Sequence, residues 1–140
     1  MQLSHHDKLA EQLDRHGANH LSQTNRRYLL LLAVHIPVFV GIGSWMETGP
    51  MLALSLSCII LSGPVLMMVA APDRLVTSLA LGAAGMCMSG LLIHLGRGLV
   101  ELHFHIFVLL AVSTAFGKAL VLWVETLTVV NHHVAFSLWI

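Results

Sequence analysis

The chain alternates between long apolar runs and short polar breaks along most of its length. A membrane-spanning helix needs about 20 consecutive, mostly apolar residues, and five runs approach or reach that length. These runs cover residues 28–46, 50–71, 75–95, 99–116 and 119–140. The breaks between them, "ETG", "PDR", "GRG" and "GK", are short and rich in turn-forming residues. The pattern therefore predicts an all-α, integral membrane up-down bundle of about five transmembrane helices.

Composition supports a membrane protein and excludes several other classes. Apolar residues make up 56% of the chain and charged residues 10%, which is too few to coat a soluble domain of this size. The formal net charge is zero, so no basic surface indicates a nucleic-acid partner, and the expected partner is the lipid bilayer. Cys58 and Cys87 both fall inside apolar runs, and we expect buried free thiols there.

The basic residues predict an orientation. Residues 1–27 are polar and form an expected cytoplasmic amphipathic segment, helical up to His16–Gly17, ahead of a transmembrane bundle at 28–140. With the N-terminus inside, only Arg97 among the seven basic residues lies on the outer side, and Ile140 lies there too. The cytoplasmic six are Lys8, Arg15, Arg26, Arg27, Arg74 and Lys118. This asymmetry is typical of a bacterial inner-membrane protein with a cytoplasmic N-terminus.

Histidines gather near the outer face in this topology. The stretch "ELHFHIFV" places Glu101, His103 and His105 about 3 to 9 Å below the outer boundary of the fourth span. The stretch "NHH" places His132 and His133 about 10 to 12 Å below the end of the fifth span. Two further histidines belong to other spans: His94 closes the third, and His35 lies nearer the centre of the first. Histidines from several helices at one depth indicate a site.

Helical spacing selects a core pair. Glu101 and His105 are four residues apart, so an α-helix would stack them on one face and let the carboxylate orient the ring. His132 comes from the next antiparallel helix at a matching depth. We therefore expect His105 and His132 to be the main ligands. The flanking ligands would be His103, His133 and His94, and the supporting residues Glu101, Asn131, Thr128 and His35.

Three chemistries fit such a cluster. Neutral imidazoles bind a transition metal ion such as copper, iron or zinc. Two facing histidines could instead hold a b-type haem, with the small residues Gly82, Gly85, Ser89 and Gly90 giving the porphyrin room. Clustered histidines could also take up protons near neutral pH. A small transporter or a proton-responsive protein is the alternative use of the same histidines, whereas a single membrane histidine is usually a hydrogen-bonding residue.

The stretches "AVHIPVFV", "LLIHLGRGLVELHFHIFVLLAV" and "NHHVAFSLW" resemble the His-rich N-terminal multi-pass region of some bacterial chemoreceptors (methyl-accepting chemotaxis proteins) and diguanylate cyclases. The resemblance extends from about Tyr28 to the last residue. It implies a sensory input module for signal transduction or chemotaxis that is not itself an enzyme. It also implies an output domain reached through at least one more span, or a signalling partner or homo-oligomer.

Overall fold

The computed structural model of the chain is all-helical over the part that it describes, the backbone of residues 5–139 and the side chains of 7–135, 137 and 138. The predicted runs at 50–71, 75–95 and 119–140 each carry one α-helix close to the expected bounds. The helix of the first run begins at His5, well before the expected residue 28, and the fourth run divides into an α-helix between two 3-10 turns. The first three helices are α1 (His5–Trp45), α2 (Pro50–Ala70) and α3 (Leu75–Leu95). The remaining elements are η1 (Val100–His103), α4 (Phe104–Ser113), η2 (Thr114–Phe116) and α5 (Ala119–Trp139). The expected ends at residue 1 and Ile140 lie outside the described residues.

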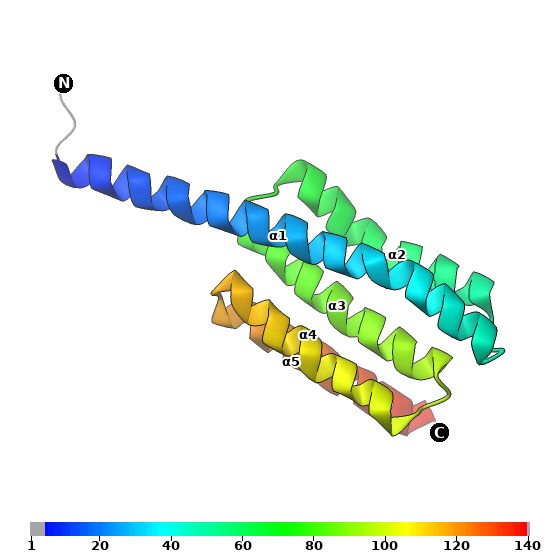
Figure 1. Ribbon diagram of the computed structural model, residues 1–140. Coiled ribbons are helices and arrows are strands. Elements are labelled where there is room, and N and C mark those ends of the chain that lie inside the picture. The colour runs from blue at the N-terminus through cyan, green and yellow to red at the C-terminus, as the bar shows by residue number, and fades with distance from the viewer. Residues whose placement is uncertain (1–4, 140) are drawn as a thin grey trace.

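Helix α1 is twice as long as a membrane span requires. It runs without interruption through Gly17 and Pro37, and its 41 residues extend over about 62 Å. The sequence predicted a helix break near His16–Gly17. A glycine costs a helix only about 1 kcal/mol relative to alanine, and Arg15 and Ala18 near it are good helix formers, so the helix continues. Figure 1 shows the N-terminal part of α1 projecting beyond the other helices.

Within the described residues, three helices, α1, α2 and α3, are long and apolar enough to cross a membrane. The apolar stretch from Val100 to Phe116 is shorter and consists of the ten-residue α4 with a 3-10 turn at each end. Length and composition therefore support a membrane protein.

Helix α3 is the centre of the bundle. It lies between the α1–α2 pair and the α4–α5 pair, and it contacts all four of these helices (Figure 1). Most of its residues are buried, among them Leu81, Met88 and Leu95. Small residues along α3 let its neighbours approach closely, which is how helices associate in lipid.

The outward faces of the bundle are strongly apolar. Large exposed side chains include Leu30, Val34 and Val38 on α1 and Phe104 and Phe107 on α4. Soluble monomers rarely expose so much contiguous apolar surface, whereas acyl chains would cover it in a bilayer. The two cysteines are free, as predicted, but they lie exposed on this outer surface rather than buried, so the expectation of buried thiols is wrong.

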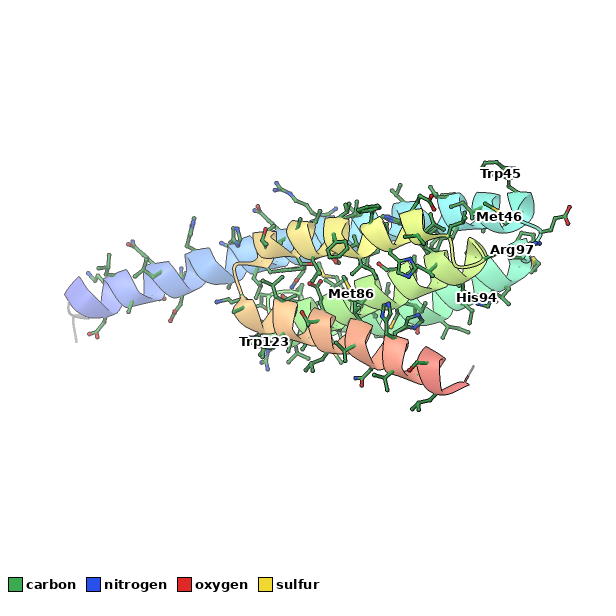
Figure 2. All side chains as sticks on the ribbon, turned by 90° about the horizontal axis from the view of Figure 1, so that it is seen from below. Trp45, Met46, Met86, His94, Arg97 and Trp123 are labelled. Carbon is green, nitrogen blue, oxygen red and sulfur yellow. The ribbon has the colours of Figure 1, made fainter. Side chains whose placement is uncertain are left out.

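The loops between the helices define two ends of the bundle. The α1–α2 and α3–η1 loops share one end, where Trp45, Met46, His94 and Arg97 lie together (Figure 2). We call it the His94 end. The α2–α3 and η2–α5 loops, which carry Arg74 and Lys118, form the other end, called the Lys118 end.

Candidate functional site

The histidine-rich stretch does not begin as an α-helix. Residues Val100–His103 form a 3-10 turn, and α4 starts only at Phe104. Side chains three residues apart eclipse in a 3-10 turn, so Glu101 lies over Phe104, and His105 is about a third of a turn further round. Glu101 is exposed. The expected stacking of Glu101 on His105 assumed α-helical geometry from residue 99 and does not occur.

His105 instead contacts two other helices. Its Nδ1 atom lies 2.8 Å from Ser89 Oγ on α3, and its Nε2 atom lies 3.0 Å from His35 Nε2 on α1. His35 Nδ1 in turn donates to the Leu31 carbonyl at 2.7 Å, and Ser89 Oγ lies 3.1 Å from the Gly85 carbonyl. A chain of four hydrogen-bonding contacts therefore joins α1, α4 and α3.

The hydrogens of this chain can be counted. Both ends are backbone carbonyls, which only accept, while two neutral imidazoles and one hydroxyl supply three hydrogens for four contacts. One added proton would complete the chain. The 3.0 Å between the two Nε2 atoms leaves no room for a metal ion in line, because two metal–nitrogen bonds of about 2.0 Å each would need about 4 Å.

A cavity opens at the His94 end. It has a volume of about 500 Å³, and its lining includes four histidines from three elements together with Arg97 and Thr48. The histidines are His94 of α3, His103 of η1, and His132 and His133 of α5. The ring centroids of His103 and His133 are 6.0 Å apart, and those of His132 and His133 are 5.9 Å apart. We call this space the His94 cavity.

Two of these rings have their tautomer set by the backbone. His103 Nδ1 lies 3.3 Å from the Leu99 carbonyl, and His133 Nδ1 lies 2.9 Å from the Val129 carbonyl. A carbonyl only accepts, so each Nδ1 carries the hydrogen and each neutral ring presents the lone pair on Nε2. This is the arrangement in which a histidine binds a metal ion.

The expected site residues therefore divide into two groups. His105 and His35 line a cavity of about 230 Å³ beside α1, whereas His132 lines the His94 cavity, so the expected core pair of His105 and His132 is not brought together. Asn131 is exposed, and the Thr128 hydroxyl bonds to the Val124 carbonyl of its own helix. Within the described residues, no three His, Cys, Asp or Glu side chains are grouped as they would be around a metal ion.

A second polar group lies closer to the Lys118 end and was not expected from the sequence. Glu125 of α5 is fully buried, and its Oε1 accepts a hydrogen bond from Ser113 Oγ. Tyr28 Oη lies 3.4 Å from the same Oε1 and 3.1 Å from Ser113 Oγ. One buried polar cluster thus joins α1, α4 and α5.

A third polar group follows one turn further along α1. Asn25 and Ser78 are both fully buried, and Ser78 Oγ donates to Asn25 Oδ1 at 2.8 Å. Asn25 Nδ2 donates to the Pro72 carbonyl at 2.8 Å, which ties α1 to the α2–α3 loop. Buried polar groups therefore continue from the histidines toward the Lys118 end.

The glycines of α3 make room for these side chains. A Cβ atom at Gly85 would lie 2.6 Å from Tyr28 Oη, one at Gly82 would lie 3.1 Å from Glu125 Oε1, and one at Gly90 would lie 2.9 Å from His132 Cε1. The space over the three glycines is therefore occupied by protein. It does not form the slot for a porphyrin that the sequence suggested.

The residues that sequence reasoning missed are polar partners from other helices: Ser89, Tyr28, Ser113, Asn25 and Ser78. One signal for them was present in the sequence. Ser78, Gly82, Gly85 and Ser89 follow the spacing of a single helical face, and every one of them meets a polar group in the structure.

No protein-family model, curated protein or solved structure matches the chain. The resemblance to chemoreceptor and diguanylate cyclase sensory regions therefore depends on the quoted sequence motifs alone.

Proposed function

We propose that the protein is the membrane-embedded sensory input module of a bacterial signalling system, and that its His94 cavity binds a transition metal ion. The observation that supports this most directly is the convergence of His94, His103, His132 and His133 from three elements on one cavity. Five helices would span the inner membrane, with the N-terminus in the cytoplasm and the His94 cavity near the outer face. An output domain or signalling partner would lie outside this chain.

The donor chemistry narrows the choice of metal. Imidazole nitrogen suits copper, zinc, iron and nickel, and His103 and His133 already present Nε2 lone pairs. Glu101 does not line the cavity, which weakens the case for iron, because non-haem iron sites use a carboxylate beside their histidines. Arg97 also lines the cavity, and its positive charge disfavours every metal cation equally. Copper and zinc are the best fit. The rings must turn toward one another on binding, because no metal-ready group exists among the described residues.

Binding of this kind would act on helix packing. A metal ion held by His94, His103 and His132 or His133 would link α3, η1 and α5 at one end of the bundle. A ligand shifts an equilibrium between conformations by its differential affinity for them, so metal would favour the arrangement in which these elements lie close. The resulting change in the position of α5 is the signal that we propose.

The test is metal analysis and absorption spectroscopy of the full chain in lipid nanodiscs, as purified and after addition of copper, zinc or haemin. We expect about one copper or zinc ion per chain in the wild type. His132→Ala and His133→Ala should each lose most of it, since a metal site loses its geometry with a ligand. The matched control is His20→Ala, an exposed histidine of α1 that does not line the His94 cavity.

His105→Ala separates the two histidine groups. It should retain the metal, because His105 is engaged with Ser89 and His35 in another cavity. Protein that stays colourless and takes up none of the three additions would refute the proposal. A haem spectrum would replace the metal ion with a porphyrin and would require the helices to rearrange around Gly82, Gly85 and Gly90.

A further inference from the structure

Glu125 has an unusual environment for an acidic residue. Its side chain, on α5, is fully buried, and its Oε1 atom accepts hydrogen bonds from the hydroxyl groups of Ser113 and Tyr28. Its Oε2 atom is shielded from solvent and has no hydrogen-bond partner among the residues that the structure describes. Half of the carboxyl group therefore lies in a nonpolar setting.

The surrounding charges do not compensate an ionised carboxylate. The titratable group that faces Glu125 from α1 is Tyr28. Gly82 faces it from α3 and Ser113 from α4, and neither of these carries a charge. The basic residues nearest to this end of the bundle are all exposed; they are Arg26, Arg27, Arg74 and Lys118. A buried charge without a counter-ion is strongly unfavourable, and such groups become neutral instead.

A neutral carboxyl group fits the hydrogen bonds. Ser113 has one hydrogen but three acceptors within reach: Glu125 Oε1, Tyr28 Oη at 3.1 Å and the Leu109 carbonyl at 2.9 Å. If Glu125 carries a hydrogen on Oε1, it can donate to Ser113 Oγ, and the Ser113 hydrogen can then satisfy the Leu109 carbonyl. The Oε2 atom then becomes a carbonyl oxygen, which carries less negative charge than a carboxylate oxygen. Leaving it without a hydrogen-bond donor is therefore less unfavourable.

We propose that Glu125 is a proton-binding site inside the bundle, which holds one proton in the folded state and releases it only when α5 separates from α1 and α3. Separation is needed because the carboxyl group is pressed against α3, where even a Cβ at Gly82 would lie 3.1 Å from Oε1. A metal cation is a poorer occupant. Both hydroxyl groups lie at Oε1, and no hydrogen-bonding group lies beside Oε2. Divalent cations such as Mg²⁺ and Ca²⁺ take about six or more oxygen ligands, which this site does not offer. This site is separate from the His94 cavity and does not depend on the proposed metal function.

The first experiment detects the proton by infrared spectroscopy of the full chain in nanodiscs at pH 7. An exposed glutamate has a pKa of about 4.3 and is ionised there. We expect a protonated-carboxyl band in the wild type that Glu125→Gln lacks and that the exposed-site control Glu47→Gln retains. Absence of the band from the wild type would overturn the proposal, and so would its loss on adding Na⁺ at constant pH.

The second experiment measures the link between proton binding and helix packing. The folded protein holds a proton that the unfolded chain, with its carboxyl in water, releases above about pH 4.3, so stability must fall as pH rises. Between pH 5 and 7 the unfolding equilibrium constant of the wild type should rise about tenfold per pH unit relative to that of Glu125→Gln. Glu47→Gln should follow the wild type. Equal pH dependence in the wild type and Glu125→Gln would show that the carboxyl is ionised in the folded bundle.

Should Glu125→Gln fail to insert, the wild type alone decides the question. Isotope labelling of glutamate shifts the band of a protonated glutamate side chain, and Glu125 is the one glutamate of the described residues that is buried. A band that shifts with the label at pH 7 supports the site, and a spectrum with ionised glutamate alone refutes it.

Discussion

Replacing Gly85 with alanine tests the packing of the polar cluster directly. The new methyl group would lie 2.6 Å from Tyr28 Oη and 3.4 Å from Leu109 Cδ1, and the first of these distances is too short for any stable contact. Tyr28 cannot easily move, because its ring packs against Phe116 at 5.0 Å between centroids and its hydroxyl bonds within the cluster. Overpacking of this kind costs about 1–3 kcal/mol. Alanine returns up to about 1 kcal/mol of helix propensity, so the net loss should be about 0–2 kcal/mol.

The assay is reversible unfolding in mixed detergent–SDS micelles, followed by circular dichroism. Gly41→Ala is the matched control, because nothing lies within 4 Å of a Cβ there and its stability should be unchanged or slightly raised. Tyr28→Phe removes the clashing oxygen and by itself loses about 1 kcal/mol of hydrogen bonding. The Tyr28→Phe/Gly85→Ala double variant should therefore lose about 1–2 kcal/mol less stability than the sum of the losses of the two single variants. Strict additivity, or a Gly85→Ala variant as stable as Gly41→Ala, would refute the reasoning.

Two further predictions concern the orientation of the chain in the membrane and the hydrogen bonds of Asn25. The distribution of the seven basic residues predicts an N-terminus inside, so a reporter fused after Ile140 should be active only if it folds in the periplasm. Activity of a cytoplasmic reporter there would reverse the predicted topology. Asn25→Ala removes both 2.8 Å hydrogen bonds, to Pro72 and from Ser78, and should destabilise the bundle by about 1–3 kcal/mol in the same unfolding assay. Exposed Gln23→Ala serves as its control, and equal stability of the two variants would show that the Asn25 contacts contribute nothing.

The bounds of α2 and α3 could be predicted because they depend on local signals. A run such as residues 75–95 is apolar throughout and is bounded by "PDR" and "GRG", and the structure places α3 at Leu75–Leu95. Length and hydropathy decide where a helix can cross a bilayer, and both can be measured along the chain. The continuity of α1 through Gly17 was less predictable, because a single glycine lowers helix stability without ending a helix.

The partners of the histidines could not be predicted, because they depend on how each helix is rotated about its axis. The two residues Glu101 and His105 share a face only if the segment is α-helical from its start, and the 3-10 turn at Val100–His103 removes that relation. His35 was expected to be a supporting residue, yet it is the direct partner of His105 across 70 residues of sequence. Tyr28, at the start of a span, has the appearance of an interfacial residue, and its buried hydrogen bonds appear only once α4 and α5 are in place.

The polar face of α3 explains why these contacts occur in layers. Ser78, Gly82, Gly85 and Ser89 lie on one side of the central helix, where they meet polar groups of α1, α4 and α5. Acyl chains are as apolar as the side chains that they replace, so burial of apolar surface does not draw helices together in a bilayer, and close packing and interhelical hydrogen bonds determine their register. A change of charge at Glu125 would therefore act on α1, α3, α4 and α5 at once, whereas a metal ion in the His94 cavity would act on α3, η1 and α5 at the opposite end. The two sites share α3 and α5, and coupling between them would have to pass through these two helices.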